Sequence, residues 1–233
     1  MLKVRVENFS MKGSLEMAKA IVFDMDGVIF DTERVCDMVW MEISREIGFE
    51  KGEIALKNCV GMNRRSEAEY FAANHPEVDF EWFASELSGR MLRWLDENGM
   101  PVKTGARELL TWLRENMWKT ALATSTRKSS VMHHLESAGI TDMFDEIVTG
   151  DMVENGKPHP EIYLTACERL GTAPEDTYAV EDSRNGLRSA HDAGMMAILV
   201  PDTTVPTDEM LSIAHRKEEN LLRVMEYLQS REM

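Results

Sequence analysis

Short apolar runs alternate with amphipathic stretches over most of the second half of the chain. Apolar runs bounded by turn residues indicate buried strands, and apolar positions three or four apart indicate helices. The predicted strands cover residues 21–23, 118–124, 146–149, 177–180 and 195–200. The predicted helices cover residues 129–138, 160–170, 185–193 and 218–229. Because strands alternate with helices, we expect an α/β fold with a parallel sheet covered on both faces, and ligands at the carboxyl ends of its strands.

A different pattern occupies residues 33–98, which lack β-rich runs and carry many charges. Apolar residues such as Val39 and Ile43 recur there at helical spacing. The stretch leaves the predicted sheet after its first strand and returns near Pro101, so we expect a helical insert that hangs over the site as a cap. The expected limits are 17–34 with 99–233 for the core, 35–98 for the cap domain, and 1–16 for an N-terminal extension.

Composition narrows the class of protein. Lys plus Arg number 26 against 41 Asp plus Glu, and the resulting net charge of −15 repels nucleic acid and anionic membranes. The three cysteines are scattered without a CxxC pair, which disfavours a disulfide framework and a zinc site. The chain has no apolar stretch of membrane-spanning length and no coiled-coil heptads. We therefore expect a cytoplasmic monomer that has neither nucleic acid nor a membrane as a partner.

Two aspartates end the first predicted strand. Asp24 and Asp26 are two residues apart, so in an extended chain both carboxylates can face one spot, and Gly27 follows them. Two like charges this close repel each other. The pair is tolerable when a cation lies between the two carboxylates or when one carboxyl group works as an acid.

Further polar clusters fall at or near the ends of later strands. Residues 124–127 form a run of three hydroxyl residues and an arginine that enters a helix, which suits an anion. Lys157 lies in a loop before a helix, where an ammonium can bind phosphate as a point charge. Glu181 and Asp182 end another strand. Together with the first acidic pair, they predict a hard cation held by oxygen ligands, as Mg²⁺ usually is, beside a phosphoryl group.

Each cluster has a simpler interpretation when it is taken alone. Thr124 or Ser125 can cap a helix, and Asp182 or Ser183 can cap the helix that follows them. Lys157 alone would be an ordinary exposed lysine. The favoured interpretation depends on all of the clusters falling along one edge of the same sheet.

The whole set resembles the haloacid dehalogenase superfamily, in its phosphatase and β-phosphoglucomutase-like branch with a helical cap. The resemblance covers the chain from about residue 19 and rests on four motifs in the family's order. These are DMDGVIFDTE at 24–33, ALATS at 121–125, GKPHPEIY at 156–163 and VEDSRNGLRSAHDAG at 180–194. The resemblance implies a Rossmann-like core with a small helical cap domain.

The resemblance also assigns roles by position. Asp24 is similar to the nucleophile that forms an aspartyl-phosphate, and Asp26 to the general acid and base. Mg²⁺ would be held by the Asp24 side chain, the Asp26 main-chain carbonyl, Asp182 and Glu181. The phosphoryl oxygens would be bound by Thr124 and Lys157, with help from the Ser125 backbone N–H.

The cap decides which reaction follows. Gly61-Met62-Asn63-Arg64 resembles the family's specificity loop, so we expect Arg64, and less directly Arg65, to bind the substrate. The family's mutases carry a histidine ten residues after the acid and base aspartate, where this chain has Cys36. We therefore predict a phosphatase acting on a small phosphorylated metabolite, most plausibly a sugar phosphate. A hexose-phosphate mutase and a non-catalytic sugar-phosphate binding protein remain as alternatives.

Overall fold

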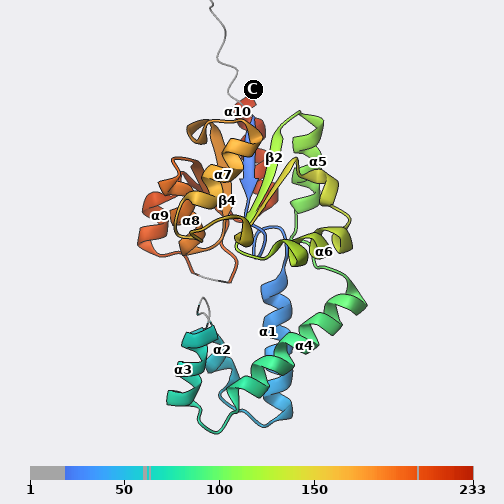
Figure 1. The fold of residues 1–233 in the computed structure, drawn as a ribbon, viewed down its shortest axis with the longest axis vertical. Coiled ribbons are helices and arrows are strands. Elements are labelled where there is room, and N and C mark those ends of the chain that lie inside the picture. Colours follow the sequence, from blue (N-terminus) through green and yellow to red (C-terminus); the bar gives the residue numbers. More distant parts are fainter. Residues whose placement is uncertain (1–18, 60–61, 63, 204, 233) are drawn as a thin grey trace, which may run out of the picture.

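A six-stranded parallel sheet forms the centre of the core. The computed structural model describes residues 19–59, 62, 64–203 and 205–232, and the predicted extension 1–16 lies outside them. The strands run in the order β3-β2-β1-β4-β5-β6 (Figure 1). They are β1 (Ala20–Phe23), β2 (Lys119–Thr124), β3 (Glu146–Thr149), β4 (Thr177–Glu181), β5 (Met196–Leu199) and β6 (Arg216–Lys217). This arrangement confirms the predicted α/β class and its Rossmann-like parallel sheet.

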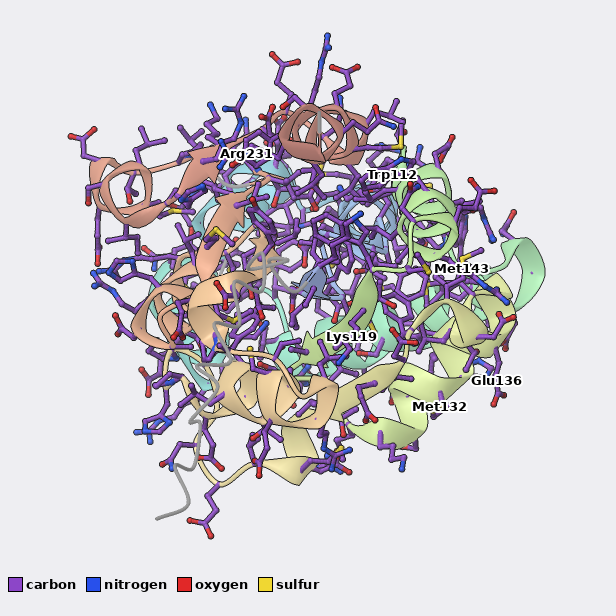
Figure 2. All side chains as sticks on the ribbon, turned by 90° about the horizontal axis from the view of Figure 1, so that it is seen from above. Trp112, Lys119, Met132, Glu136, Met143 and Arg231 are labelled. Carbon is purple, nitrogen blue, oxygen red and sulfur yellow. The ribbon has the colours of Figure 1, made fainter. Side chains whose placement is uncertain are left out.

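Alternate residues of β1 face opposite sides of the sheet, as the two-residue period of a strand requires. Ile21 and Phe23 pack into one apolar cluster, and Ala20 and Val22 pack into another. The covering helices are α5 (Ala106–Glu115), α6 (Lys128–Ala138) and α10 (Leu221–Glu232) on the first face, and α7 (Glu161–Leu170), α8 (Arg184–Asp192) and α9 (Asp208–Ile213) on the second. Figure 2 looks onto the core from above, with Trp112 marking α5. β1 is therefore buried on both faces.

Four helices fill the stretch in which the sequence predicted a helical insert. They are α1 (Thr32–Glu46), α2 (Gly52–Cys59), α3 (Arg64–Asn74) and α4 (Phe80–Asn98), called the helical unit below. The unit has its own apolar cluster, in which the Trp40 and Phe83 ring centroids lie 4.8 Å apart. It lies beyond the carboxyl ends of the strands (Figure 1). Its limits as a cap domain, 35–98, stay a prediction.

The last predicted helix begins later in the structure than in the sequence prediction. Helix α10 begins later than the predicted 218–229, because the Glu218 N–H donates to Leu199 O at 2.9 Å and continues the ladder between β5 and β6. The Asn220 side chain then accepts from the Arg223 N–H at 3.1 Å at the start of the helix. Helices α5 and α9 and the short edge strand β6 were not predicted. No helix of the described residues combines the length and apolarity needed to cross a membrane.

Candidate active site

The register of β1 against its neighbours brings two predicted acids together. Phe23 pairs with Leu122 of β2 and with Val180 of β4. The Asp24 N–H extends the ladder by donating to Val180 O at 3.0 Å. Asp24 and Glu181 are the next residues on adjacent strands, so they lie level with each other. They occupy the edge of the sheet where parallel α/β folds bind ligands.

Lys157 lies between these two acids. Its Nζ is 2.5 Å from Asp24 Oδ1 and 2.6 Å from Glu181 Oε1, and it donates to Ala123 O at 3.0 Å. The Lys157 side chain is 7% exposed and the Glu181 side chain is fully buried. Because unpaired buried charges are costly, each of these groups depends on the others. The structure thus brings three predicted site residues from separate parts of the chain into direct contact.

Glu181 has two more partners that sequence analysis missed. The Tyr163 hydroxyl donates to Glu181 Oε1 at 2.7 Å, and the Ser183 hydroxyl donates to Oε2 at 3.0 Å. Ser183 Oγ also accepts from the Gly186 N–H at 3.0 Å and so caps α8, as the simpler interpretation of this cluster expected. Tyr163 lies among apolar residues of α7, so its sequence position gave no polar signal. Both oxygens of Glu181 are therefore already hydrogen-bonded.

Asp182 completes a cluster of three acids. One oxygen each from Asp24, Glu181 and Asp182 lie within 4.8 Å of one another. Gly27 lies against this cluster with a φ of +82°, and a Cβ there would be 2.3 Å from Asp182 Oδ2. A side chain at that position would displace the carboxylate. Oxygen donors of this kind are the ligands that Mg²⁺ and other hard cations take, so the residues present fit a divalent metal.

The pKa values of Asp24 and Asp182 in this cluster also favour a bound cation. Burial raises the pKa of Asp24 to about 7, although Lys157 opposes the shift. Burial and the nearby charge of Glu181 raise the pKa of Asp182 to about 9. The single ammonium does not balance the three acids. A bound cation would lower both pKa values by supplying the missing positive charge.

Asp26 is held by a separate pair of hydroxyls. Thr32, the first residue of α1, donates to Asp26 Oδ1 at 3.1 Å, and Thr126 donates to Oδ2 at 3.0 Å. Neither threonine was among the predicted site residues, although Thr126 belongs to the hydroxyl run that ends β2. Because a hydroxyl can donate or accept, this pair can partner both the carboxylate and the carboxylic acid.

Thr124 and Ser125 lie at the end of β2, beside the end of β1. Thr124 is buried, and its Oγ1 accepts from the Thr126 N–H at 3.1 Å. Ser125 is exposed. A Cβ on Gly150 would lie 2.2 Å from the Ser125 carbonyl oxygen. Only a glycine lets the end of β3 approach this loop so closely. The predicted contact of Thr124 and Ser125 with a phosphoryl group stays a prediction.

The two predicted arginines of the helical unit are engaged in pairs within that unit. Arg64 Nη2 lies 2.8 Å from Glu81 Oε2, and Arg65 Nε lies 3.0 Å from an acid of the same helix. Gly61 and Asn63 of the expected specificity loop lie outside the described residues. Within the described part of the chain, no hydrogen bond or ion pair joins either arginine to the acids of the core. Their expected role in substrate binding stays a prediction.

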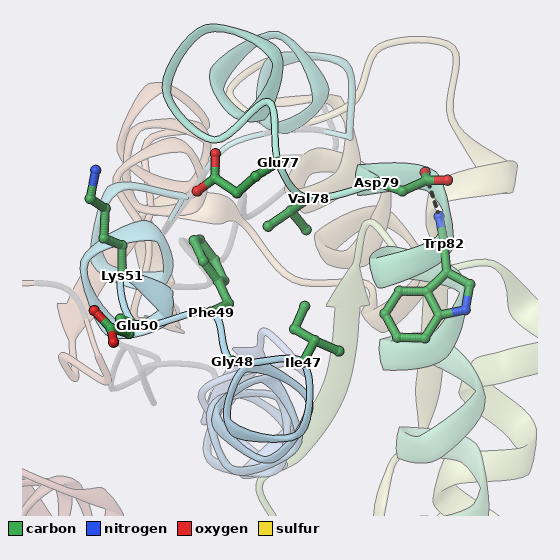
Figure 3. Close-up of a pocket in the computed structure, with 9 residues that line it drawn as sticks. All are labelled: Ile47, Gly48, Phe49, Glu50, Lys51, Glu77, Val78, Asp79 and Trp82. Carbon is green, nitrogen blue, oxygen red and sulfur yellow. Dashed lines mark hydrogen bonds between the residues drawn. The ribbon is translucent and has the colours of Figure 1, made fainter.

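A hollow of about 440 Å³ lies in the helical unit (Figure 3). It is formed where the α1–α2 and α3–α4 connections meet. Its lining comprises Ile47, Gly48, Phe49, Glu50, Lys51, Glu77, Val78, Asp79 and Trp82. None of the predicted site residues belongs to it, so it is separate from the acidic cluster.

Comparisons with known proteins agree with the fold and the motifs. A model of the family described as haloacid dehalogenase-like hydrolase matches residues 21–200. The "Phosphorylated carbohydrates phosphatase" of Thermotoga maritima is 33% identical over 181 residues, which are 77% of this chain and 83% of that protein. The "Beta-phosphoglucomutase" of Bacillus subtilis is 29% identical over 197 residues, which are 77% of this chain and 82% of that protein.

A solved structure has the same fold as this chain. The HAD family hydrolase of Deinococcus radiodurans, whose crystal structure holds phosphate and sodium, superposes with a TM-score of 0.78 at 26% sequence identity. The match covers 91% of this chain and 95% of that one. It therefore includes both the sheet and the helical unit.

Proposed function

The chain belongs to the haloacid dehalogenase-like hydrolase family, and we propose that it is a Mg²⁺-dependent phosphatase that hydrolyses a small phosphorylated carbohydrate through an aspartyl-phosphate. The observation that carries the proposal is the contact of Lys157 with both Asp24 and Glu181, next to Asp182. This arrangement offers a carboxylate nucleophile, an ammonium and further acids at one edge of the sheet. The sugar substrate is supported by the name of the Thermotoga maritima relative.

The reaction begins at Asp24. Its carboxylate attacks phosphorus, a new O–P bond forms, and the ester O–P bond to the sugar breaks. A phosphate monoester repels a carboxylate, so the attack needs positive charge nearby. Lys157 provides it, since its Nζ lies 2.5 Å from Asp24 Oδ1. We assign the binding of the phosphoryl oxygens to this ammonium, to Thr124 and to the Ser125 backbone N–H.

Asp26 is assigned the proton transfers. It gives a proton to the departing sugar oxygen and then takes one from the water that hydrolyses the aspartyl-phosphate, which restores Asp24 and releases phosphate. Thr32 and Thr126 keep its carboxyl group in place through both steps, because each hydroxyl can follow the change in protonation.

The metal would be held by the side chains of Asp24 and Asp182, with Glu181 beside them, and by the Asp26 main-chain carbonyl that the family resemblance implies. When bound, Mg²⁺ supplies positive charge that keeps Asp24 ionised and offsets the charge of the phosphoryl group. Of the three acids, Glu181 has both oxygens engaged by protein donors. We therefore assign Glu181 mainly to holding Lys157, and Asp24 and Asp182 to direct contact with the metal.

A hexose-phosphate mutase is the second candidate, favoured by the similarity to the Bacillus subtilis β-phosphoglucomutase. The chemistry of Cys36 argues for hydrolysis. Burial and the charge of Glu33 raise the pKa of its thiol to about 12, so the thiol stays neutral and cannot replace the histidine that the family's mutases carry there. Formation of glucose 6-phosphate from β-glucose 1-phosphate with a bisphosphate primer would establish the mutase instead.

The proposal is tested by phosphate release. The purified protein is incubated with a panel of sugar monophosphates, with Mg²⁺ or with a chelator. We expect release that needs the metal and is lost in Asp24→Asn. The matched control is Asp142→Asn, which changes an acid whose side chain is 80% exposed, and it should keep wild-type activity. A silent wild-type protein, or a fully active Asp24→Asn variant, would contradict the proposal.

A further inference from the structure

The chain crosses between the core and the helical unit twice, and the two crossings are bonded to each other. The Asp31 N–H donates to Pro101 O at 2.9 Å, and the Lys103 N–H donates to Ile29 O at 2.9 Å. Phe30 and Val102, which lie between these pairs, form an antiparallel bridge. The start of α1 and the chain that follows α4 therefore move together.

The side chain of Lys103 ties this junction to the core. Its Nζ is 3.1 Å from Asp31 Oδ1 on the opposite crossing, and it also contacts Asp202 Oδ1 in the loop after β5. The Lys103 side chain is 20% exposed and that of Asp202 is 11% exposed, so solvent screens this pairing less than it screens a surface ion pair. Among the described residues, Asp202 Oδ2 is buried and has no hydrogen-bond partner. The charge of Asp202 thus depends on Lys103.

The junction adjoins the acid that moves protons in the proposed reaction. Asp31 immediately precedes Thr32, and the Thr32 hydroxyl donates to Asp26 Oδ1 at 3.1 Å. A continuous set of contacts therefore runs from Asp202 through Lys103 and Asp31 to Thr32 and Asp26. A shift of the first turn of α1 would move the Thr32 hydroxyl away from its carboxylate.

We propose that Lys103 is a positioning residue for the reaction: by joining Asp31 to Asp202 it holds the start of α1, so that Thr32 keeps Asp26 in place. This inference rests on the proposed phosphatase function. Without the ammonium, Asp31 keeps its exposed partner Arg34 at 3.0 Å, but nothing bridges Asp31 to Asp202 and the two acids repel each other. A cavity of about 520 Å³ lined in part by both acids gives them room to separate, and the junction then loosens.

The test compares Lys103→Met and Lys103→Arg with the wild type by two readouts. The first is hydrogen exchange of the backbone amides at positions 31 and 103, which report on the junction without needing activity. We expect about tenfold faster exchange at both amides in Lys103→Met. The second is steady-state phosphate release. We expect kcat to fall about tenfold with KM changed less than about twofold, because Asp26 acts in the chemical steps. Lys103→Arg should restore most of both.

Two controls separate positioning from general damage. Glu209→Gln disrupts a different set of ion pairs, those of Glu209 with Arg184 and Arg188 at 2.6 Å on the core surface, and should change neither readout. The amide of Val22 in β1 reports global opening. If exchange and kcat in Lys103→Met match the wild type, or if Val22 exchange rises as much as exchange at the junction, the inference is wrong. If the wild type releases no phosphate, the proposed phosphatase function is wrong. Hydrogen exchange at positions 31 and 103 then still decides whether Lys103 holds the junction.

Discussion

Tyr163→Phe removes one buried hydroxyl and almost nothing else. Tyr163 and Glu181 are both fully buried, and the hydroxyl donates to Glu181 Oε1 at 2.7 Å. Lys157 Nζ also lies 5.1 Å from the centroid of the Tyr163 ring, in a cation–π contact that a phenylalanine ring keeps. The substitution therefore isolates the hydrogen bond to Glu181.

The magnitude follows from the partners that remain. A hydrogen bond to a charged group contributes about 1.5–3 kcal/mol to stability. Glu181 Oε1 keeps Lys157 at 2.6 Å, so its charge is not left unpaired, and we expect a loss of about 2 kcal/mol in the free energy of unfolding. In a chain of this length, that corresponds to a fall in Tm of about 4–8 °C. The hydroxyl does not contact Asp24, so kcat at saturating Mg²⁺ should change less than about threefold.

Urea unfolding and phosphate release measure the two effects on the same preparations. The matched control is Tyr227→Phe, whose hydroxyl lies 3.2 Å from His215 Nε2 and whose ring keeps its contact with Arg216. That pair is near the surface, and its loss should cost less than about 0.5 kcal/mol. Equal stability of Tyr163→Phe and the wild type would refute the view that this hydroxyl supports Glu181. A large fall in kcat with unchanged stability would refute it as well.

Two further predictions concern the acidic cluster. The pKa of Asp24 is raised to about 7 and that of Asp182 to about 9, from ordinary values near 4. These shifts stabilise the folded state fully at a pH below 4, and the stabilisation is lost as the pH rises through 7 and 9. Thermal melts of the metal-free protein should thus show Tm falling over this pH range. Mg²⁺ should raise Tm more at alkaline than at acid pH. A Mg²⁺ effect on Tm that does not depend on pH would count against the cluster as the metal site. Gly27→Ala should lower stability by at least about 2 kcal/mol and weaken Mg²⁺ binding measured by calorimetry, because its Cβ would displace Asp182. Gly194→Ala is its control: φ is +85° there and nothing lies within 4 Å, so Mg²⁺ affinity should stay unchanged, and equal affinity losses in both variants would contradict the displacement.

The strands of the core were predictable because local pattern and tertiary environment agree there. β1 and β4 are buried on both faces, so β1 is apolar throughout, and only Thr177 and the Tyr178 hydroxyl interrupt the apolar character of β4 before Glu181. The short strand β6 escaped prediction because both of its residues, Arg216 and Lys217, are exposed and charged. Its place is fixed by pairing with β5, which no local pattern encodes. Helix α10 was placed too early for the same reason.

The clustering of Asp24, Lys157, Glu181 and Asp182 could be predicted, because these residues lie at strand ends or after a glycine, where sequence position implies location. Thr32 and Tyr163 could not, because a threonine at a helix start and a tyrosine on an apolar helix face have ordinary structural explanations. Their importance arises from contacts with Asp26 and Glu181, far away along the chain. The surroundings of Arg64 were equally hidden, since its ion pair depends on how α3 meets α4.

The two aspartates of the proposed mechanism are held by different parts of the molecule. Asp24 is fixed by the core alone, through the β1 ladder and Lys157. The Asp26 carboxylate accepts one hydrogen bond from Thr32, the first residue of the helical unit, and another from Thr126. Movement of that unit would therefore disturb proton transfer before it disturbed the nucleophile. Under the proposed mechanism, this asymmetry makes proton transfer by Asp26, rather than attack by Asp24, depend on the position of α1.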